Sequence, residues 1–208
     1  MHIESLLCDW DGETVMIRFD RPTGAWIFIA IHSTRLGQAM GGTRMKSYPD
    51  PAAALLDALR LAASGMTYKF AVPNIPSGGG KAVIDVPAHF DPGSRPALLQ
   101  RYGTLVRQLN GLFFTGPDVS ISPTDMDIIS LTAAPFILYA PDYVINVGGA
   151  MAVPGIEISG WSRQKAETEM ADPVRRVSRE VLGQAAAEGI TTELAARRIA
   201  EDHLSRAV

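Results

Sequence analysis

Polar and apolar residues alternate over residues 13–19 (ETVMIRF), a pattern that is typical of a half-buried β-strand. Turn-forming residues follow at Asp20, Pro22 and Gly24, and the apolar run at residues 25–32 (AWIFIAIH) then predicts a second strand. The two segments together predict a β-hairpin. The glycine-containing stretch at residues 33–43 is expected to be a loop.

Beyond the hairpin, helical and extended patterns alternate. Asp50 followed by Pro51 is a helix-start signal, and the apolar face behind it predicts a helix to about Ser64. Further strands are expected at residues 81–86, 112–115 and 143–147, and further helices at residues 93–109 and 123–130. Two amphipathic helices follow from residue 165 to residue 208, separated at Gly189 and Thr191. This alternation favours an α/β fold with a mostly parallel, mixed sheet flanked by helices.

The composition narrows the class of protein. The chain has 208 residues, of which 47% are hydrophobic and 20% charged, with a net charge of −3, so it is expected to form a globular protein without a basic surface for nucleic acid. Cys8 is the only cysteine, which excludes an intramolecular disulfide. The first residues do not form a signal-peptide pattern and no apolar run is long enough to span a bilayer. We therefore expect a cytoplasmic protein that does not bind membranes.

Several common motifs are absent or incomplete. The triplet Gly78-Gly79-Gly80 before Lys81 resembles a phosphate-binding loop, but Ile75 replaces the first glycine of that motif. No G-x-G-x-x-G fingerprint occurs, and the four histidines do not have the spacing of metal ligands. The sequence predicts neither a cofactor nor a metal. The glycine triplet itself fits a tight loop before a strand equally well as a close approach to a ligand.

Three charged residues stand beside apolar segments: Lys69, Lys81 and Asp118. A lysine in apolar surroundings either loses its charge more easily or pairs with an anion, and both behaviours suit a catalytic or binding site. Each residue alone is explained as well by a strand end whose charged group lies in water. The combination of all three favours a functional site.

The segments that carry these residues resemble the catalytic domain of the Glu/Leu/Phe/Val dehydrogenases. The resemblance extends from about Trp10 to Ile129, where GGTRM, MTYK and GGGKA stand out, and resumes at Ala140 with APDYVINVGGA. It implies one amino-acid-dehydrogenase-like domain over residues 1–208, with the main α/β part at residues 1–129 and C-terminal helices at residues 140–208.

The resemblance also implies roles for individual residues. Lys69 and the Gly41-Gly42 backbone would hold the substrate carboxylate, and Lys81 would be the general acid and base. Asp118 would pair with the substrate amino group or with Lys81 and assist proton transfer. The pocket for the substrate side chain would be formed by Met40, Met66, Ala150 and Val153.

In the family, a nucleotide-binding Rossmann domain lies between the two matching parts, whereas here residues 130–139 join them directly. We therefore expect chemistry without hydride transfer on an α-amino or α-keto acid or its imine: imine formation or hydrolysis, tautomerisation, or condensation with a second amine or carbonyl substrate. The alternative is a non-catalytic amino-acid-binding module or a partner subunit of a full-length dehydrogenase. A laboratory truncation of a longer enzyme is a third interpretation. A homodimer or larger homo-oligomer is expected in each case.

Overall fold

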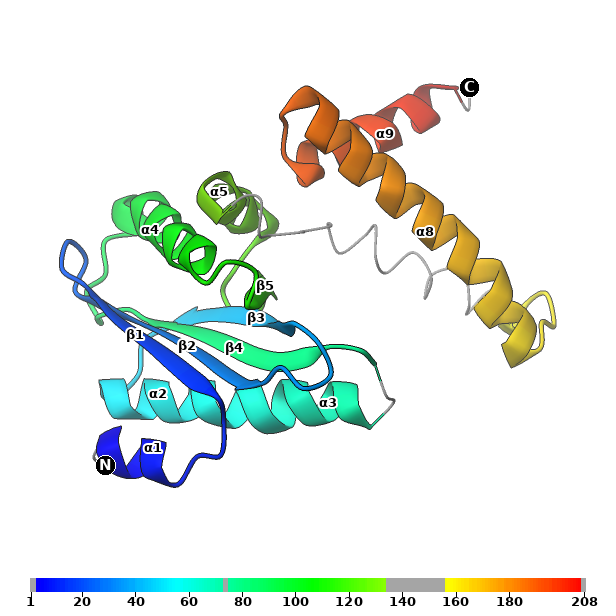
Figure 1. The fold of residues 1–208 in the computed structure, drawn as a ribbon. Coiled ribbons are helices and arrows are strands. Elements are labelled where there is room, and N and C mark those ends of the chain that lie inside the picture. The colour runs from blue at the N-terminus through cyan, green and yellow to red at the C-terminus, as the bar shows by residue number, and fades with distance from the viewer. Residues whose placement is uncertain (1–2, 73–74, 134–155, 207–208) are drawn as a thin grey trace. The chain divides into compact units, whose positions relative to one another are not determined.

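The computed structural model describes residues 3–72, 75–133 and 156–206 (Figure 1). Contacts divide the chain into two compact units, Met1–Leu138 and Tyr139–Val208. Among the helices in the described ranges, none combines the length and the apolar character that crossing a membrane would need. The expectation of one domain over the whole chain stays a prediction.

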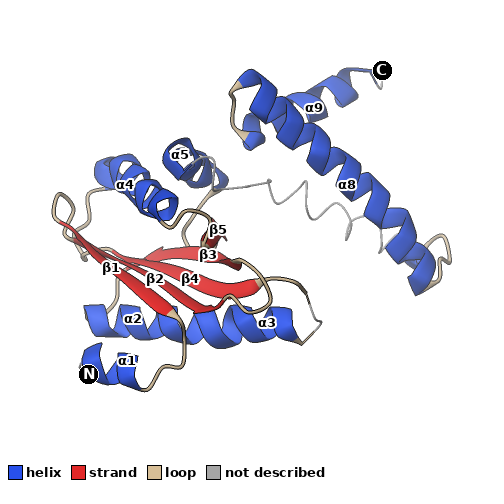
Figure 2. Ribbon diagram, in the orientation of Figure 1, coloured by secondary structure: helices blue, strands red, loops and turns tan. Residues whose placement is uncertain are grey.

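The first unit is built on a five-stranded mixed sheet with the strand order β1-β2-β4-β3-β5 (Figure 2). Its strands are β1 (Thr14–Asp20), β2 (Ala25–Ser33), β3 (Ala39–Lys46), β4 (Gly78–Asp85) and β5 (Phe113–Pro117). The pairs β1/β2 and β2/β4 are antiparallel, whereas β3 pairs in parallel with both β4 and β5. The α/β fold with a mixed sheet is thus confirmed.

Helices cover both faces of this sheet (Figure 1). One face carries α1 (Ile3–Cys8), α2 (Pro51–Arg60), a π-helical turn (Leu61–Thr67) and α3 (Tyr68–Ala71), and the other carries α4 (Arg95–Gln108) and α5 (Pro123–Ala133). Because β2 and β4 lie between other strands and are covered on both faces, nearly all their residues are buried.

Local sequence signals explain where several helices begin and end. The Asp50 side chain accepts a hydrogen bond of 2.8 Å from the Ala53 amide, and Pro51 occupies the first turn of α2, as predicted. In the second unit, α8 (Arg163–Glu188) ends at Gly189, whose φ of 64° is left-handed. The Thr191 hydroxyl then caps α9 (Thr192–Arg206) by accepting from the Leu194 amide at 3.1 Å.

The predicted hairpin and the helices over residues 93–109 and 123–130 are also found. The expectation of a loop over residues 33–43 is wrong, because β3 begins at Ala39 and lies between β4 and β5. Glycine lowers the strand propensity of this stretch, yet the sheet requires it: a Cβ at Gly41 would lie 1.8 Å from the Gly80 carbonyl oxygen. The strand predicted at residues 143–147 lies outside the described residues.

The glycine triplet at residues 78–80 is part of strand β4 and forms no separate loop. The cause is again close packing. A Cβ at Gly79 would lie 2.1 Å from the Thr67 hydroxyl oxygen, so the π-helical turn rests directly on the β4 backbone. The triplet therefore allows a helical segment to approach the sheet closely, two residues before Lys81.

A buried hydroxyl cluster holds the parallel strands to α4. The Thr43 hydroxyl lies 2.6 Å from the Tyr102 hydroxyl and 2.5 Å from that of Thr115, and all three side chains are buried. Burial raises the pKa of Tyr102 to about 12. Because the three hydroxyls satisfy one another, they hold β3 and β5 in register next to Gly42.

Candidate functional site

Strand register places Gly42 beside Lys81 and puts Asp118 just beyond the end of the neighbouring strand. Thr43 on β3 is opposite Ala82 on β4, so the preceding residues Gly42 and Lys81 lie side by side. On its other edge, Gly42 is opposite Gly116 of β5, and Asp118 follows the last residue of that strand. Gly42 therefore lies between the strand that carries Lys81 and the loop that carries Asp118.

Lys81 and Asp118 form an ion pair over Gly42. The Lys81 Nζ lies 2.9 Å from Asp118 Oδ2, and the exposed fractions of the two side chains are only 7% and 25%. Burial alone would raise the pKa of Asp118, but the hydrogen bonds and positive charges of Lys81 and Arg44 outweigh it and hold that pKa below its ordinary value. The Asp118 carboxylate is therefore ionised at neutral pH.

Gly42 makes this ion pair possible because it has no side chain. A Cβ on Gly42 would lie 2.8 Å from the Asp118 Cβ and 3.3 Å from the Lys81 Nζ. Contacts of that length would push the carboxylate away from the sheet. The second glycine of the GGTRM segment is thus explained by the space that the pair occupies.

Arg44, two residues further along β3, also binds Asp118. Its Nε donates to Asp118 Oδ2 at 2.9 Å, and its Nη1 donates to Asp57 Oδ2 on α2 at 2.9 Å. Sequence reasoning missed Arg44. The signal in the sequence was an arginine that follows two glycines and Thr43 and precedes Met45. In the structure Thr43 and Met45 are buried and Arg44 is partly buried, and an arginine in such a position requires an anionic partner.

Lys69 lies on α3, so the view of it as a strand-end residue is wrong. Its side chain is exposed and makes no ion pair with the described residues. Met66 is half-buried in the π-helical turn just before it. Such turns often occur at functional sites. Thr67, between these two residues, is 3.0 Å from the Nδ1 of the buried His32, which connects this segment to β2.

Two of the other predicted site residues, Met40 and Gly41, lie next to each other on β3. Gly41 is buried in β3, and Met40 beside it is 42% exposed, with its sulfur accepting a hydrogen bond of 3.3 Å from the Ser77 hydroxyl. Ala150 and Val153 lie outside the described residues. The structure therefore brings Gly42, Lys81 and Asp118 together, and β4 contacts both the π-helical turn and α3.

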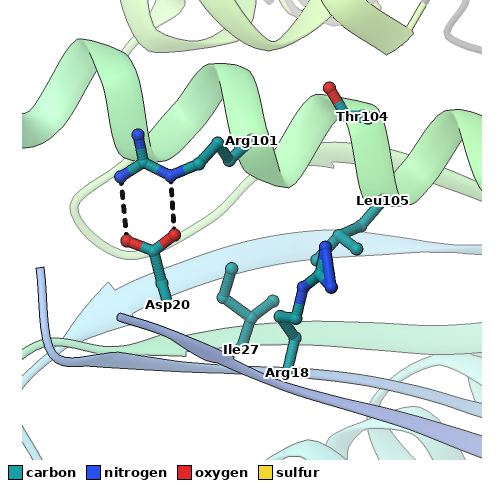
Figure 3. Close-up of a pocket in the computed structure, with 6 residues that line it drawn as sticks. All are labelled: Arg18, Asp20, Ile27, Arg101, Thr104 and Leu105. Carbon is teal, nitrogen blue, oxygen red and sulfur yellow. Dashed lines mark hydrogen bonds and ion pairs between the residues drawn. The ribbon is translucent and has the colours of Figure 1, made fainter. Parts of the chain in front are cut away.

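A small cavity of about 100 Å³ lies apart from these residues, on the face of the sheet that α4 covers (Figure 3). Arg101 of α4 makes two hydrogen bonds to the buried carboxylate of Asp20, at 2.6 and 2.8 Å. Arg18 reaches towards α4 beside them without an ion pair to any described residue. Asp20 and Arg101 neutralise each other's charge, so this ion pair links β1 to α4. Within the described ranges, no group of three or more acidic, histidine or cysteine side chains could hold a metal ion.

Comparison with known proteins identifies the family. Residues 15–134 match the family model described as "Glu/Leu/Phe/Val dehydrogenase, dimerisation domain". The chain belongs to the Glu/Leu/Phe/Val dehydrogenase family. The match includes Gly42, Arg44, Lys69, Lys81 and Asp118.

Individual relatives cover the same region. An L-tryptophan dehydrogenase of Nostoc punctiforme is 54% identical over 103 residues, which are 49% of this chain and 28% of that protein. A leucine dehydrogenase of Geobacillus stearothermophilus is 44% identical over 120 residues, 58% of this chain and 32% of that protein. The chain thus spans about a third of the length of these relatives.

Solved structures agree with this assignment. The crystal structure of the L-tryptophan dehydrogenase from Nostoc punctiforme has a TM-score of 0.60 at 38% identity, over 76% of this chain and 46% of that one. A hetero-hexameric glutamate dehydrogenase from Thermus thermophilus in a leucine-bound form has a TM-score of 0.52 at 20% identity, with the same coverage. The second likeness supports the fold alone.

Proposed function

We propose that this chain binds an α-amino or α-keto acid, or the imine that links them, and moves protons at it without hydride transfer. The observation that carries the proposal is the buried Lys81–Asp118 pair over Gly42. A lysine amine held beside a carboxylate can give and take a proton at a substrate nitrogen, at the α-carbon or at an attacking water. The names of the matched relatives, which include tryptophan and leucine dehydrogenases, favour an amino-acid substrate.

Each proposed role uses the chemistry of one side chain. Lys69, exposed and without an anionic partner among the described residues, would neutralise the substrate carboxylate together with the Gly41-Gly42 backbone. Lys81, as the neutral amine, would take a proton from water as the oxygen adds to the imine carbon and would return it to the imine nitrogen. It would then pass the second proton, from the new hydroxyl, to the same nitrogen as the carbon–nitrogen bond breaks and the carbonyl forms. The products are a keto acid and ammonia, and the reverse direction forms the imine. Met40 and Met66 would border the substrate side chain.

No step of this proposal passes through a nicotinamide. That cofactor would supply hydride chemistry in the family, but the residues present do not fit it, since no G-x-G-x-x-G fingerprint occurs in the 208 residues. Imine formation and hydrolysis, tautomerisation and amine–carbonyl condensation all need only acid–base catalysis.

Proton NMR in D₂O, without nucleotide, tests the proposal. Branched and aromatic α-amino and α-keto acids are incubated with and without added amines, using wild type and the Lys81→Ala and Lys165→Ala variants. Lys165 is an exposed control. We expect loss of the α- or β-proton signal, or an imine-derived product, to slow about 100-fold or more in Lys81→Ala and to be unchanged in Lys165→Ala. Equal rates in wild type and Lys81→Ala would refute a catalytic role for Lys81.

A variant of Lys69 tests carboxylate binding separately. In Lys69→Ala, the concentration of amino acid needed for half-saturation should rise about tenfold, the loss expected for one charge-assisted hydrogen bond. The corresponding amine without a carboxyl group should bind both proteins equally. An equal loss for both ligands would assign Lys69 a structural role.

A second candidate function, a partner subunit, is favoured by the open edge of the sheet. Among the strands that the structure describes, β1 pairs with β2 alone, and Ile17 and Phe19 on it are 38% and 43% exposed. Unpaired strand edges commonly associate with another chain. Assembly could be with a second copy, as a homodimer, or with a full-length amino acid dehydrogenase. Native mass spectrometry with and without such a dehydrogenase distinguishes these assemblies, and a monomer in both samples would exclude them.

A further inference from the structure

Within the described part of the chain, the Asp118 carboxylate is bound through one of its two oxygens. Both the Lys81 Nζ and the Arg44 Nε lie 2.9 Å from Oδ2. Among the described residues, Oδ1 has no hydrogen-bond partner, although Asp118 is three-quarters buried. Two cations on one oxygen fix the carboxylate in rotation, and its second oxygen remains available to a ligand.

We propose that Arg44 is a positioning residue: it holds Asp118 so that Oδ1 receives the amino or imino group of the substrate while Lys81 remains free to exchange protons. This inference rests on the proposed function. The resemblance already implies that Asp118 pairs with the substrate amino group, and the inference adds the role of Arg44 in holding that carboxylate. A carboxylate oxygen is a suitable partner for an ammonium or iminium ion, because the contact is a charge-assisted hydrogen bond.

The far side of Arg44 is anchored to α2. Its Nη1 binds Asp57 Oδ2 at 2.9 Å, and the Tyr48 hydroxyl donates to the same oxygen at 2.7 Å. Arg60 donates to Asp57 Oδ1 at 2.9 Å. Asp57 is thereby held by three donors, so Arg44 has a fixed anchor on the helix and a fixed distance to Asp118.

A lysine could not replace Arg44 without loss. The guanidinium uses two separate nitrogens to contact two carboxylates on opposite sides, whereas a lysine offers a single charged nitrogen on a flexible stem. Without Arg44, Asp57 and Asp118 would lose the cation between them. The Asp118 carboxylate would then be held by Lys81 alone, the group that the reaction needs for proton exchange.

The first measurement follows the ionisation of Asp118 in the full chain. Carboxyl ¹³C NMR titrations compare wild type, Arg44→Gln and Arg44→Lys, with the Asp118→Asn variant identifying the signal. Arg60→Gln is the matched control, because Arg60 binds Asp57 without touching Asp118. We expect the pKa of Asp118 to rise in Arg44→Gln, to rise less in Arg44→Lys, and to be unchanged in Arg60→Gln.

The second measurement concerns binding. We expect the half-saturating concentration of an α-amino acid to rise about tenfold in Arg44→Gln, whereas that of the same acid without its amino group is unchanged. An unaltered pKa of Asp118 in Arg44→Gln, or equal effects in Arg60→Gln, would overturn the inference. If the wild type exchanges no substrate proton, the proposed function fails, and the titration and the ligand comparison still decide whether Arg44 positions Asp118. Arg44→Lys decides the outcome if Arg44→Gln does not fold.

Discussion

Replacing Gly42 by alanine tests whether the Lys81–Asp118 pair depends on the missing side chain between them. The new Cβ would lie 2.8 Å from the Asp118 Cβ, 2.9 Å from the Pro117 carbonyl oxygen and 3.3 Å from the Lys81 Nζ. The first two contacts are shorter than real Cβ atoms tolerate, and one of them involves the backbone. The loop that follows β5 must therefore move, and Asp118 must move with it.

The expected cost follows from comparison with a neighbouring glycine. Gly116 is opposite Gly42 in the same row of the sheet, and a Cβ there would meet nothing within 4 Å. Both substitutions restrict the unfolded chain equally, by about 0.4–1 kcal/mol, so this contribution cancels between them. The remaining difference is the overpacking at Gly42, about 1–3 kcal/mol.

Urea unfolding of wild type, Gly42→Ala and Gly116→Ala measures that difference. We expect Gly116→Ala to be as stable as wild type or slightly more stable, and Gly42→Ala to be less stable than Gly116→Ala by about 1–3 kcal/mol. The pKa of Asp118 should rise in Gly42→Ala, because the carboxylate moves away from its two cations. Equal stability of the two alanine variants, with an unchanged pKa of Asp118, would refute the reasoning.

Three further predictions concern the scaffold. Burial raises the pKa of Asp85 above its ordinary value, so the fold loses stability as the pH rises from about 4 through that raised pKa. Asp85→Asn, whose amide oxygen can still accept from the Tyr48 amide, should therefore raise the melting temperature at pH 7. Thermal unfolding at several pH values should show this advantage shrink as the pH falls through the raised pKa and vanish below about 4. Tyr102→Phe should lower the free energy of unfolding by about 1 kcal/mol in urea, because Thr43 and Thr115 still bind each other at 2.5 Å; a loss above about 3 kcal/mol would contradict this. Asp50→Ala removes the cap of α2 and should cost about 1 kcal/mol in the same assay, whereas an unchanged midpoint would mean that the cap contributes nothing.

The sequence predicted those elements whose local signals agree with the fold. The β1/β2 hairpin has clear alternation around a turn, and α2 has both its cap and its proline. The prediction failed at β3, because its small residues weaken the strand signal. The close approach of Gly41 to the Gly80 carbonyl explains why those residues are needed, and that contact joins positions 39 residues apart. A local pattern cannot register such a requirement.

The same distinction applies to the site. Lys81 and Asp118 stood out because each is a charge beside an apolar strand, and the pairing of β3 with β4 and β5 then brings them to the two sides of Gly42. Arg44 did not stand out, since its importance depends on two carboxylates, 13 and 74 positions away in the chain. The residues most easily recognised are therefore those proposed to touch the substrate. The groups that hold them in place are visible only once β3, α2 and the loop after β5 are folded together. For this reason the decisive variants are those of Gly42 and Arg44, which change the position of Asp118 while leaving Lys81 and Asp118 intact.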